Sequence, residues 1–240
     1  LGFGVDINPV MYSDLNDSQT YERIWGGLVL TTGFGELTVG SPRPLLKTMI
    51  ESPALGGVGL YDLELSAFLG SSLETLVAQE ELDVLGISFK GTSGALSYGA
   101  SYYSVEDGPS DIDVVEMAFA YQAGKTRIQG GVELIDTFSG QEKLIIGATH
   151  VEDRWSLGAL ATNFSVSGQN WTTYQLFGDY KVTDAFTIGA QVIDLEAFGD
   201  NETVYGLTGE YGFASGGFAQ LGAIDDGGPG DAVYSASIGW

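Results

Sequence analysis

The sequence of 240 residues contains no cysteine and a single histidine. Without cysteine there is no disulfide framework, no thiolate zinc site and no cysteine nucleophile. The single histidine, His150, falls beside a predicted turn. Without a second histidine and without cysteine, the sequence cannot supply the usual catalytic triads or zinc sites. Carboxylate pairs of the kind a glycosidase uses are plentiful, but acids in turns are usually only solvated. We therefore expect that the protein is not an enzyme and needs no cofactor.

Positive charge is also scarce. The chain has 9 lysine and arginine residues against 32 aspartate and glutamate residues, which gives a formal net charge of -23. Phosphate binding requires clustered basic side chains, so no nucleic-acid partner is expected. The acidity either serves solubility or a saline habitat, or it acts directly on ions by attracting cations.

Long hydrophobic runs are the third absence. No stretch of about 18 apolar residues could cross a bilayer as a helix. Yet 44% of the residues are hydrophobic, and these recur with a period of two, as in Tyr234, Ala236, Ile238 and Trp240. The same alternation appears in segments 115–121, 127–134, 155–161, 174–181, 186–192 and 203–213. This period predicts β-strands with one apolar and one polar face.

The connections between these segments alternate in kind. Tight, mostly uncharged turns are predicted at 33–35, 91–94, 123–125, 150–154, 183–184 and 215–216. Longer acidic loops are predicted at 8–21, 106–113, 136–142, 165–170, 194–202 and 225–231. Segments near 9 to 11 residues, aromatic residues at their ends and long loops at one end only are typical of a transmembrane β-barrel.

The predicted fold class is therefore all-β, with residues 1–240 forming a single antiparallel transmembrane β-barrel of about fourteen strands. An even number places both ends of the chain on the side of the short turns. The strands are expected to start near Leu1, Arg23, Gly35, Leu82, Ala95, Asp113, Lys125, Glu142, Trp155, Trp171, Ala185, Thr203, Gly217 and Ala232.

Residues 41–81 interrupt this pattern. Pro42, Pro44 and Pro53 exclude a continuous central strand. Apolar residues then recur at helical spacing, namely Leu65, Phe68, Leu69, Leu73, Leu76 and Val77. An apolar loop of this length is uncommon unless it is functional or packed against something. We expect it to fold into the barrel and narrow the lumen.

The run from Tyr21 to Pro44, YERIWGGLVLTTGFGELTVGSPRP, resembles the strand, tight G-F-G turn, second strand and exit into the constriction loop of alphaproteobacterial (Rhodobacter-type) general porins. The aromatic last residue agrees with that family. The resemblance implies a Gram-negative outer-membrane location, passive diffusion of small hydrophilic solutes and ions, a homotrimer, and contact with membrane lipid and lipopolysaccharide. Barrels of that family have sixteen strands, and residues 1–7 resemble the third. Either an amino-terminal part is missing from this chain, which we favour, or the barrel closes with fourteen.

Selectivity in such a pore would come from fixed charges around the constriction. Glu51, Asp62, Glu64 and Glu74 on the loop form a candidate acidic side. The candidate basic side across the lumen lies on the polar faces of strands and consists of Arg23, Lys125, Arg127, Lys143 and Lys181. Arg43 and Lys47 on the loop are further constriction candidates, and Arg127 is expected to pair with Glu133 of the same strand. Each could instead be a solvated side chain or a structural ion pair. The acidic excess predicts a preference for cations, weakened by salt.

Acidic side chains in the late loops could bind Ca²⁺ through oxygen ligands. The candidates are Asp194, Glu196, Asp200, Asp225 and Asp226, although no EF-hand spacing supports them. Two other functions stay open. One is a non-conducting outer-membrane barrel with a structural or adhesive surface role, and the other is a soluble all-β carbohydrate-active protein.

Overall fold

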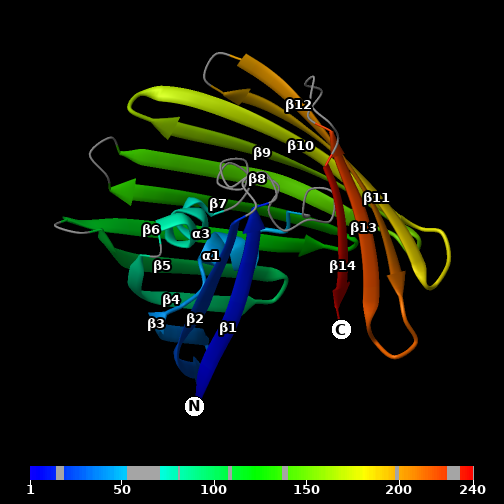
Figure 1. The fold of residues 1–240 in the computed structure, drawn as a ribbon. Coiled ribbons are helices and arrows are strands. Elements are labelled where there is room, and N and C mark those ends of the chain that lie inside the picture. The colour runs from blue at the N-terminus through cyan, green and yellow to red at the C-terminus, as the bar shows by residue number, and fades with distance from the viewer. Residues whose placement is uncertain are drawn as a thin grey trace.

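The computed structural model describes residues 1–14, 19–52, 71–80, 82–107, 110–136, 140–197, 200–225 and 233–239. These residues form one sheet of fourteen strands in chain order, which confirms the predicted number (Figure 1). The strands are β1 (Gly2–Asp14), β2 (Gln19–Thr32), β3 (Gly35–Ser41), β4 (Asp83–Ser93), β5 (Leu96–Asp107), β6 (Ser110–Ala123), β7 (Thr126–Asp136), β8 (Gln141–Val151), β9 (Trp155–Val166), β10 (Gln169–Lys181), β11 (Phe186–Ala197), β12 (Asp200–Gly212), β13 (Phe218–Asp225) and β14 (Val233–Gly239). Each pairs antiparallel with its successor.

The two faces of the sheet differ as the alternation predicts. On β6, Met117 and Phe119 are exposed on the convex face, whereas Glu116 and Ala118 are buried on the concave face. The other predicted apolar faces are likewise exposed, for example at Ile128, Leu134, Leu157, Leu176, Ile188, Tyr205, Leu207 and Tyr211. The sheet therefore presents a largely apolar outer surface, whereas its inner surface combines polar side chains with buried apolar ones.

The predicted short turns are confirmed at one end of the sheet. Two of them contain Gly94 and Gly124 with φ of 60° and 61°, a left-handed conformation that glycine adopts without a steric cost. At the other end, the prediction of long loops was partly wrong. The predicted loop 165–170 is a two-residue turn, since β9 runs to Val166 and β10 begins at Gln169. Backbone pairing continues past the apolar part of a strand because the ladder does not depend on side-chain polarity.

The sheet ends at β1 and β14, and within the described residues no register joins these two strands. The first strand begins and the last one ends at the same end of the sheet (Figure 1). The choice between fourteen and sixteen strands stays a prediction.

In the described part of the chain, two helices lie on the concave face, which confirms a partly helical loop folded inward (Figure 1). The first, α1 (Leu45–Met49), packs Leu45, Leu46, Met49 and Ile50 against Ala118, Ile145, Leu160 and Phe177. The second, α3 (Ser72–Glu80), packs Leu73 and Val77 against Trp25, Val84, Tyr103, Val105, Val114 and Ile135. The predicted helical spacing is borne out by Leu73 and Val77, whereas Leu65, Phe68 and Leu69 lie outside the described residues. No helix in the described part of the chain is long and apolar enough to span a bilayer.

Candidate functional site

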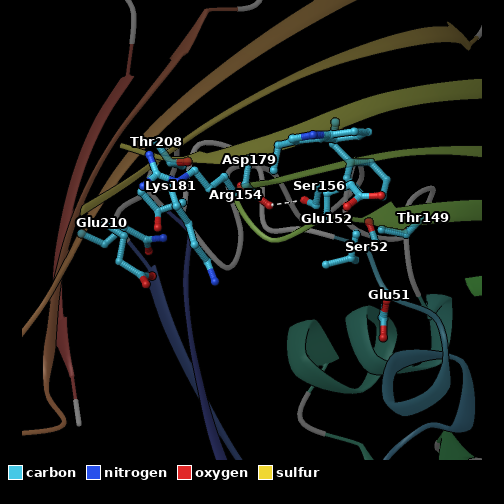
Figure 2. A pocket seen from close by; sticks show the side chains of 15 residues that line it. Glu51, Ser52, Thr149, Glu152, Arg154, Ser156, Asp179, Lys181, Thr208 and Glu210 are labelled. Atoms are coloured by element: carbon cyan, nitrogen blue, oxygen red, sulfur yellow. Dashed lines mark hydrogen bonds between the residues drawn. The ribbon is translucent and has the colours of Figure 1, made fainter. Parts of the chain in front are cut away.

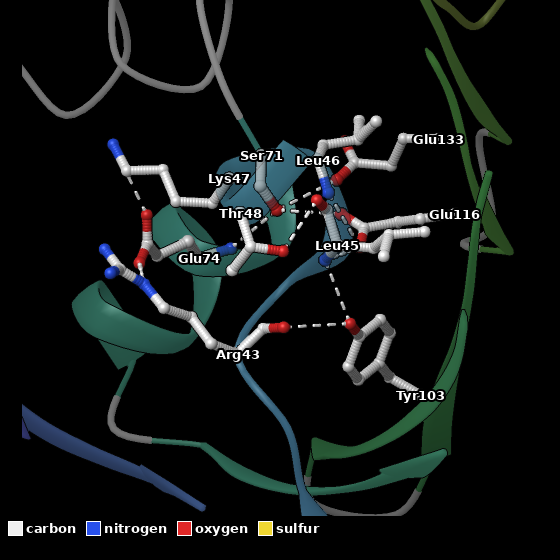
Figure 3. Close-up of polar contacts among 10 residues, drawn as sticks. All are labelled: Arg43, Leu45, Leu46, Lys47, Thr48, Ser71, Glu74, Tyr103, Glu116 and Glu133. Atoms are coloured by element: carbon white, nitrogen blue, oxygen red, sulfur yellow. Dashed lines mark hydrogen bonds and ion pairs between the residues drawn. The ribbon is translucent and has the colours of Figure 1, made fainter. Parts of the chain in front are cut away.

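The start of α1 is bound to the sheet by Glu116 of β6. This buried carboxylate accepts hydrogen bonds from the backbone N–H groups of Leu45 and Leu46. The Tyr103 hydroxyl on β5 lies 3.1 Å from the Leu45 nitrogen and donates to the Arg43 carbonyl (Figure 3). Pro44, the residue before the helix, makes no side-chain capping bond. The sheet therefore supplies the acceptor that the helix N-terminus lacks.

The start of α3 is bound in the same way by Glu133 of β7. Its carboxylate accepts from the N–H groups of Ser72 at 3.1 Å and Leu73 at 3.4 Å. Lys143 on β8 completes the group, with its ammonium 3.1 Å from Glu133, and both side chains are only 1% exposed. A negative charge is stabilised at a helix N-terminus by the unpaired N–H groups and the helix dipole.

The segment that follows α1 is held by β7 and β10. Arg127 donates to the Met49 carbonyl at 2.8 Å and forms an ion pair with Glu51 at 3.2 Å. Gln129 exchanges two hydrogen bonds with the Glu51 backbone, at 2.9 and 2.7 Å. Ser52 donates to Gln175 at 3.0 Å. These bonds fix the loop across the concave face from β6 to β10.

The predicted Arg127–Glu133 pair is wrong. The two residues do share the inner face of β7, but a separation of six residues along a strand spans about 20 Å. Each finds its partner on a different element, Glu51 for Arg127 and Lys143 for Glu133.

Arg43, Lys47 and Glu74 come together within the loop itself. Glu74 on α3 accepts from Arg43 at 2.9 Å and lies 3.6 Å from Lys47 on α1 (Figure 3). The Glu74 side chain is 6% exposed, so its charge is largely neutralised by these cations. Of the candidates Glu51 and Glu74, Glu51 is better placed to act on solutes, since its side chain is 57% exposed.

Beyond Glu51 and Ser52 the inner face opens into a cavity of about 580 Å³ (Figure 2). Its walls come from the loop and from β8 to β13. They are formed by Glu51, Ser52, Thr149, Val151, Glu152, Arg154, Trp155, Ser156, Phe177, Asp179, Lys181, Thr187, Thr208, Glu210 and Gln220. Four carboxylates against two cations give these walls a net charge of -2. Most of the remaining side chains carry a hydroxyl or amide group, so the cavity suits hydrated solutes.

A charged cluster borders the cavity at the short turns. Lys125 forms an ion pair with Glu152, and the His150 Nε2 lies 3.2 Å from the same carboxylate. The hydrogen bond from Lys125, with a further one from His150, lowers the pKa of Glu152. The same bond raises the pKa of Lys125. The His150 Nδ1 is 2.9 Å from the Thr126 hydroxyl.

The remaining predicted site residues are placed only in part. Asp62, Glu64 and Asp226 lie outside the described residues, and for Arg23, Glu196 and Asp200 only the backbone is described. Asp194 and Asp225 are exposed on β11 and β13. Within the described residues, no group of three or more histidine, aspartate or glutamate side chains is arranged to hold a metal ion. The Ca²⁺ site stays a prediction.

Glu116 and Gln129 were missed as candidate site residues. A signal for Glu116 was present, since it is the one charged residue on an inner face that otherwise carries Val114, Ala118 and Ala120. Gln129 carried no such signal, because glutamine is common on the polar face of any strand.

No protein-family model matches the chain, and no curated protein matches it. Solved structures do match. A porin structure refined at 1.8 Å resolution is 18% identical, with a TM-score of 0.72, over 98% of this chain and 90% of that one. A mutant of the Rh. blastica porin is 14% identical, with a TM-score of 0.67, over 99% and 82%. A loop-deletion mutant of OmpT, an outer membrane protein of Vibrio cholerae, is 15% identical, with a TM-score of 0.63, over 99% and 98%. The chain therefore has the fold of a porin-type β-barrel.

Proposed function

From this porin-type fold, we propose that the protein is a passive diffusion channel of the bacterial outer membrane, for small hydrophilic solutes and ions. The observation that carries the proposal is the polar cavity beside the inward loop, inside a sheet whose outer surface is apolar. A barrel that served only as a surface scaffold would not need an open interior of this size.

The outer surface supports a membrane location. The exposed fraction is 51–56% for large apolar side chains such as Leu144, Ile146, Leu157 and Leu176. Contact of such an apolar surface with water would be unfavourable. Tyrosine and tryptophan residues stand at strand ends, among them Tyr121, Trp155 and Tyr180. These three lie at the short-turn end of the sheet, where aromatic side chains suit a membrane interface.

The charge of the interior supports a preference for cations. The cavity walls carry a net charge of -2, and the whole chain carries -23. Negative walls concentrate cations in a narrow aqueous passage, and the effect weakens as salt screens the charges. The loop residues 41–81 act as the constriction, with Glu51 at its edge.

Assembly as a homotrimer and contact with lipopolysaccharide belong to the same proposal. They rest on the resemblance of residues 21–44 to general porins.

Reconstitution of the folded protein into planar bilayers tests the function. We expect stepwise increases of current, and a reversal potential in a KCl gradient that indicates faster passage of K⁺ than of Cl⁻. The same detergent without protein is the control. A folded, inserted protein that gives no current steps would favour the non-conducting barrel, and a reversal potential of the opposite sign would overturn the cation preference alone.

A further inference from the structure

We propose that the cavity beside the loop contains a binding site for small amino acids of positive net charge. In this site Arg154 and Lys181 bind the carboxylate, and Asp179 and Glu210 bind the amino groups. The proposal rests on the proposed channel function, because it concerns solutes that enter the same cavity.

Arg154 and Lys181 are neighbours at the short-turn end of the cavity. The Lys181 backbone N–H donates to the Arg154 carbonyl at 2.8 Å, and both side chains line the cavity (Figure 2). Arg43, Lys47, Lys125, Arg127 and Lys143 each form an ion pair with a carboxylate. Within the described residues, no ion pair includes Arg154 or Lys181. Two adjacent cations thus face the cavity with their charges available to a solute.

Carboxylates lie next to these cations. Asp179 is on the same strand as Lys181, and one of its oxygens accepts a 2.9 Å hydrogen bond from Ser156. Its other oxygen lies over Gly189 of β11, together with the hydroxyl of Thr208, and a Cβ at Gly189 would overlap both atoms. Because Gly189 has no side chain, the Asp179 carboxylate and the Thr208 hydroxyl can both lie above this position. Glu210 follows Thr208 on the inner face of β12 and also lines the cavity.

This arrangement selects by the combination of charges on the solute. A simple anion is repelled by Asp179 and Glu210, and a simple diamine is repelled by Arg154 and Lys181. An amino acid can place a group of opposite charge beside each pair. A net positive amino acid also fits the net charge of -2 on the walls. Because the groups are solvated, each contact is weak, and the site delays solutes in transit and does not hold them tightly.

L-lysine and cadaverine provide a direct test, because they differ only in the carboxylate. In the reconstituted channel, lysine added to KCl solution is expected to reduce the ion current in a saturable way. Replacing both cations, in the variant R154Q/K181Q, should weaken the block by lysine about fivefold, the scale of two solvent-exposed charge contacts. Block by cadaverine should stay the same or become stronger, because the two cations repel it.

Two variants control for other effects. R154K/K181R keeps both charges and should retain the lysine block. K47Q removes a positive charge on the loop whose ion-pair partner, Glu74, lies outside the cavity walls, and it should leave the preference for lysine over cadaverine unchanged. The proposal is overturned if R154Q/K181Q weakens both blocks equally, or if lysine and cadaverine block the unaltered channel alike. A protein that gives no current at all would refute the proposed channel function instead.

Discussion

Glu116 and Glu133 are directly opposite each other on β6 and β7, and the hydroxyl of Ser71 lies between their carboxylates, at 3.1 and 3.2 Å. Two carboxyl groups this close destabilise a pair of strands unless hydrogen bonds satisfy them. Here the loop offsets that cost, since the N-termini of α1 and α3 donate to the two carboxylates and Lys143 lies opposite Glu133 on β8. The sheet and the loop therefore stabilise each other through this one cluster.

Replacing Glu133 with glutamine should destabilise the barrel by about 3 kcal/mol, because Lys143 loses the carboxylate of its buried ion pair. The ammonium and carboxylate are both 1% exposed, so water cannot replace the contact. Thermal unfolding followed by circular dichroism in detergent measures the effect. Glu142→Gln, on the exposed face of β8, is the matched control and should change stability by less than about 0.5 kcal/mol.

The double variant E133Q/K143M should recover most of the loss, because it removes both buried charges. An unchanged unfolding temperature for Glu133→Gln would contradict the role of this cluster in holding the loop.

Replacing Arg127 with glutamine should make the channel more selective for cations. Arg127 neutralises Glu51 at 3.2 Å beside the cavity, and its removal leaves that carboxylate unpaired. The ratio of K⁺ to Cl⁻ permeability, obtained from reversal potentials, should rise by about twofold in dilute KCl and less at 1 M, where charges are screened within about 3 Å. A shift toward anions would show that Glu51 does not act on permeating ions.

Gly131→Ala should disturb the packing of α1 on the sheet. A Cβ at this position on β7 would overlap a methyl group of Leu46, which is fully buried. Overpacking of this kind costs about 1–3 kcal/mol. Gly212→Ala is the control, because its added Cβ would have its nearest neighbour at 3.9 Å. Equal unfolding temperatures for the two variants would argue against close packing of α1 on the sheet.

Lys125→Gln should raise the pKa of Glu152 toward its ordinary value of 4.5, because the hydrogen bond from Lys125 is the main cause of its lowered pKa. A carboxyl with a lowered pKa contributes stability above its ordinary pKa, and this contribution is lost as the pH falls through the lowered value. Lys125 is exposed and Glu152 is partly exposed, so the effect on stability is small and the pKa itself is the better measure. A ¹³C NMR titration of the Glu152 carboxyl in lipid nanodiscs checks it, with Lys47→Gln as a variant that should leave this pKa unaltered.

Ile146→Arg tests which surface meets the membrane. Ile146 lies in the middle of β8 and is 56% exposed on the outer face. An arginine at the bilayer midplane costs about 2–4 kcal/mol in a transmembrane barrel. The free energy of folding into lipid vesicles, from a denaturant titration, should fall by that amount, while Ile146→Val should cost at most about 1.5 kcal/mol. An arginine variant as stable as the valine variant would place this face outside the hydrocarbon.

The sequence by itself determined the features that depend on neighbouring residues. Alternation such as Val115, Glu116, Met117 and Ala118 sets which side chains face outward, because successive residues of a strand point to opposite sides. Turn residues then separate one strand from the next, so fourteen strands and the end with short turns followed from local patterns. The prolines after Ser41 likewise marked where the sheet pattern stops.

Only the tertiary structure decided which charged residues meet. Glu116, Glu133 and Lys143 lie on three consecutive strands and become direct neighbours only through the registers of β6, β7 and β8. Arg127 forms its ion pair with Glu51 and not with Glu133, because the loop crosses the sheet at the level of Arg127. The short helix α1 exists because the sheet supplies partners for its N-terminus. Registers and loop placement depend on contacts summed over the whole barrel, and no local pattern of residues contains that information.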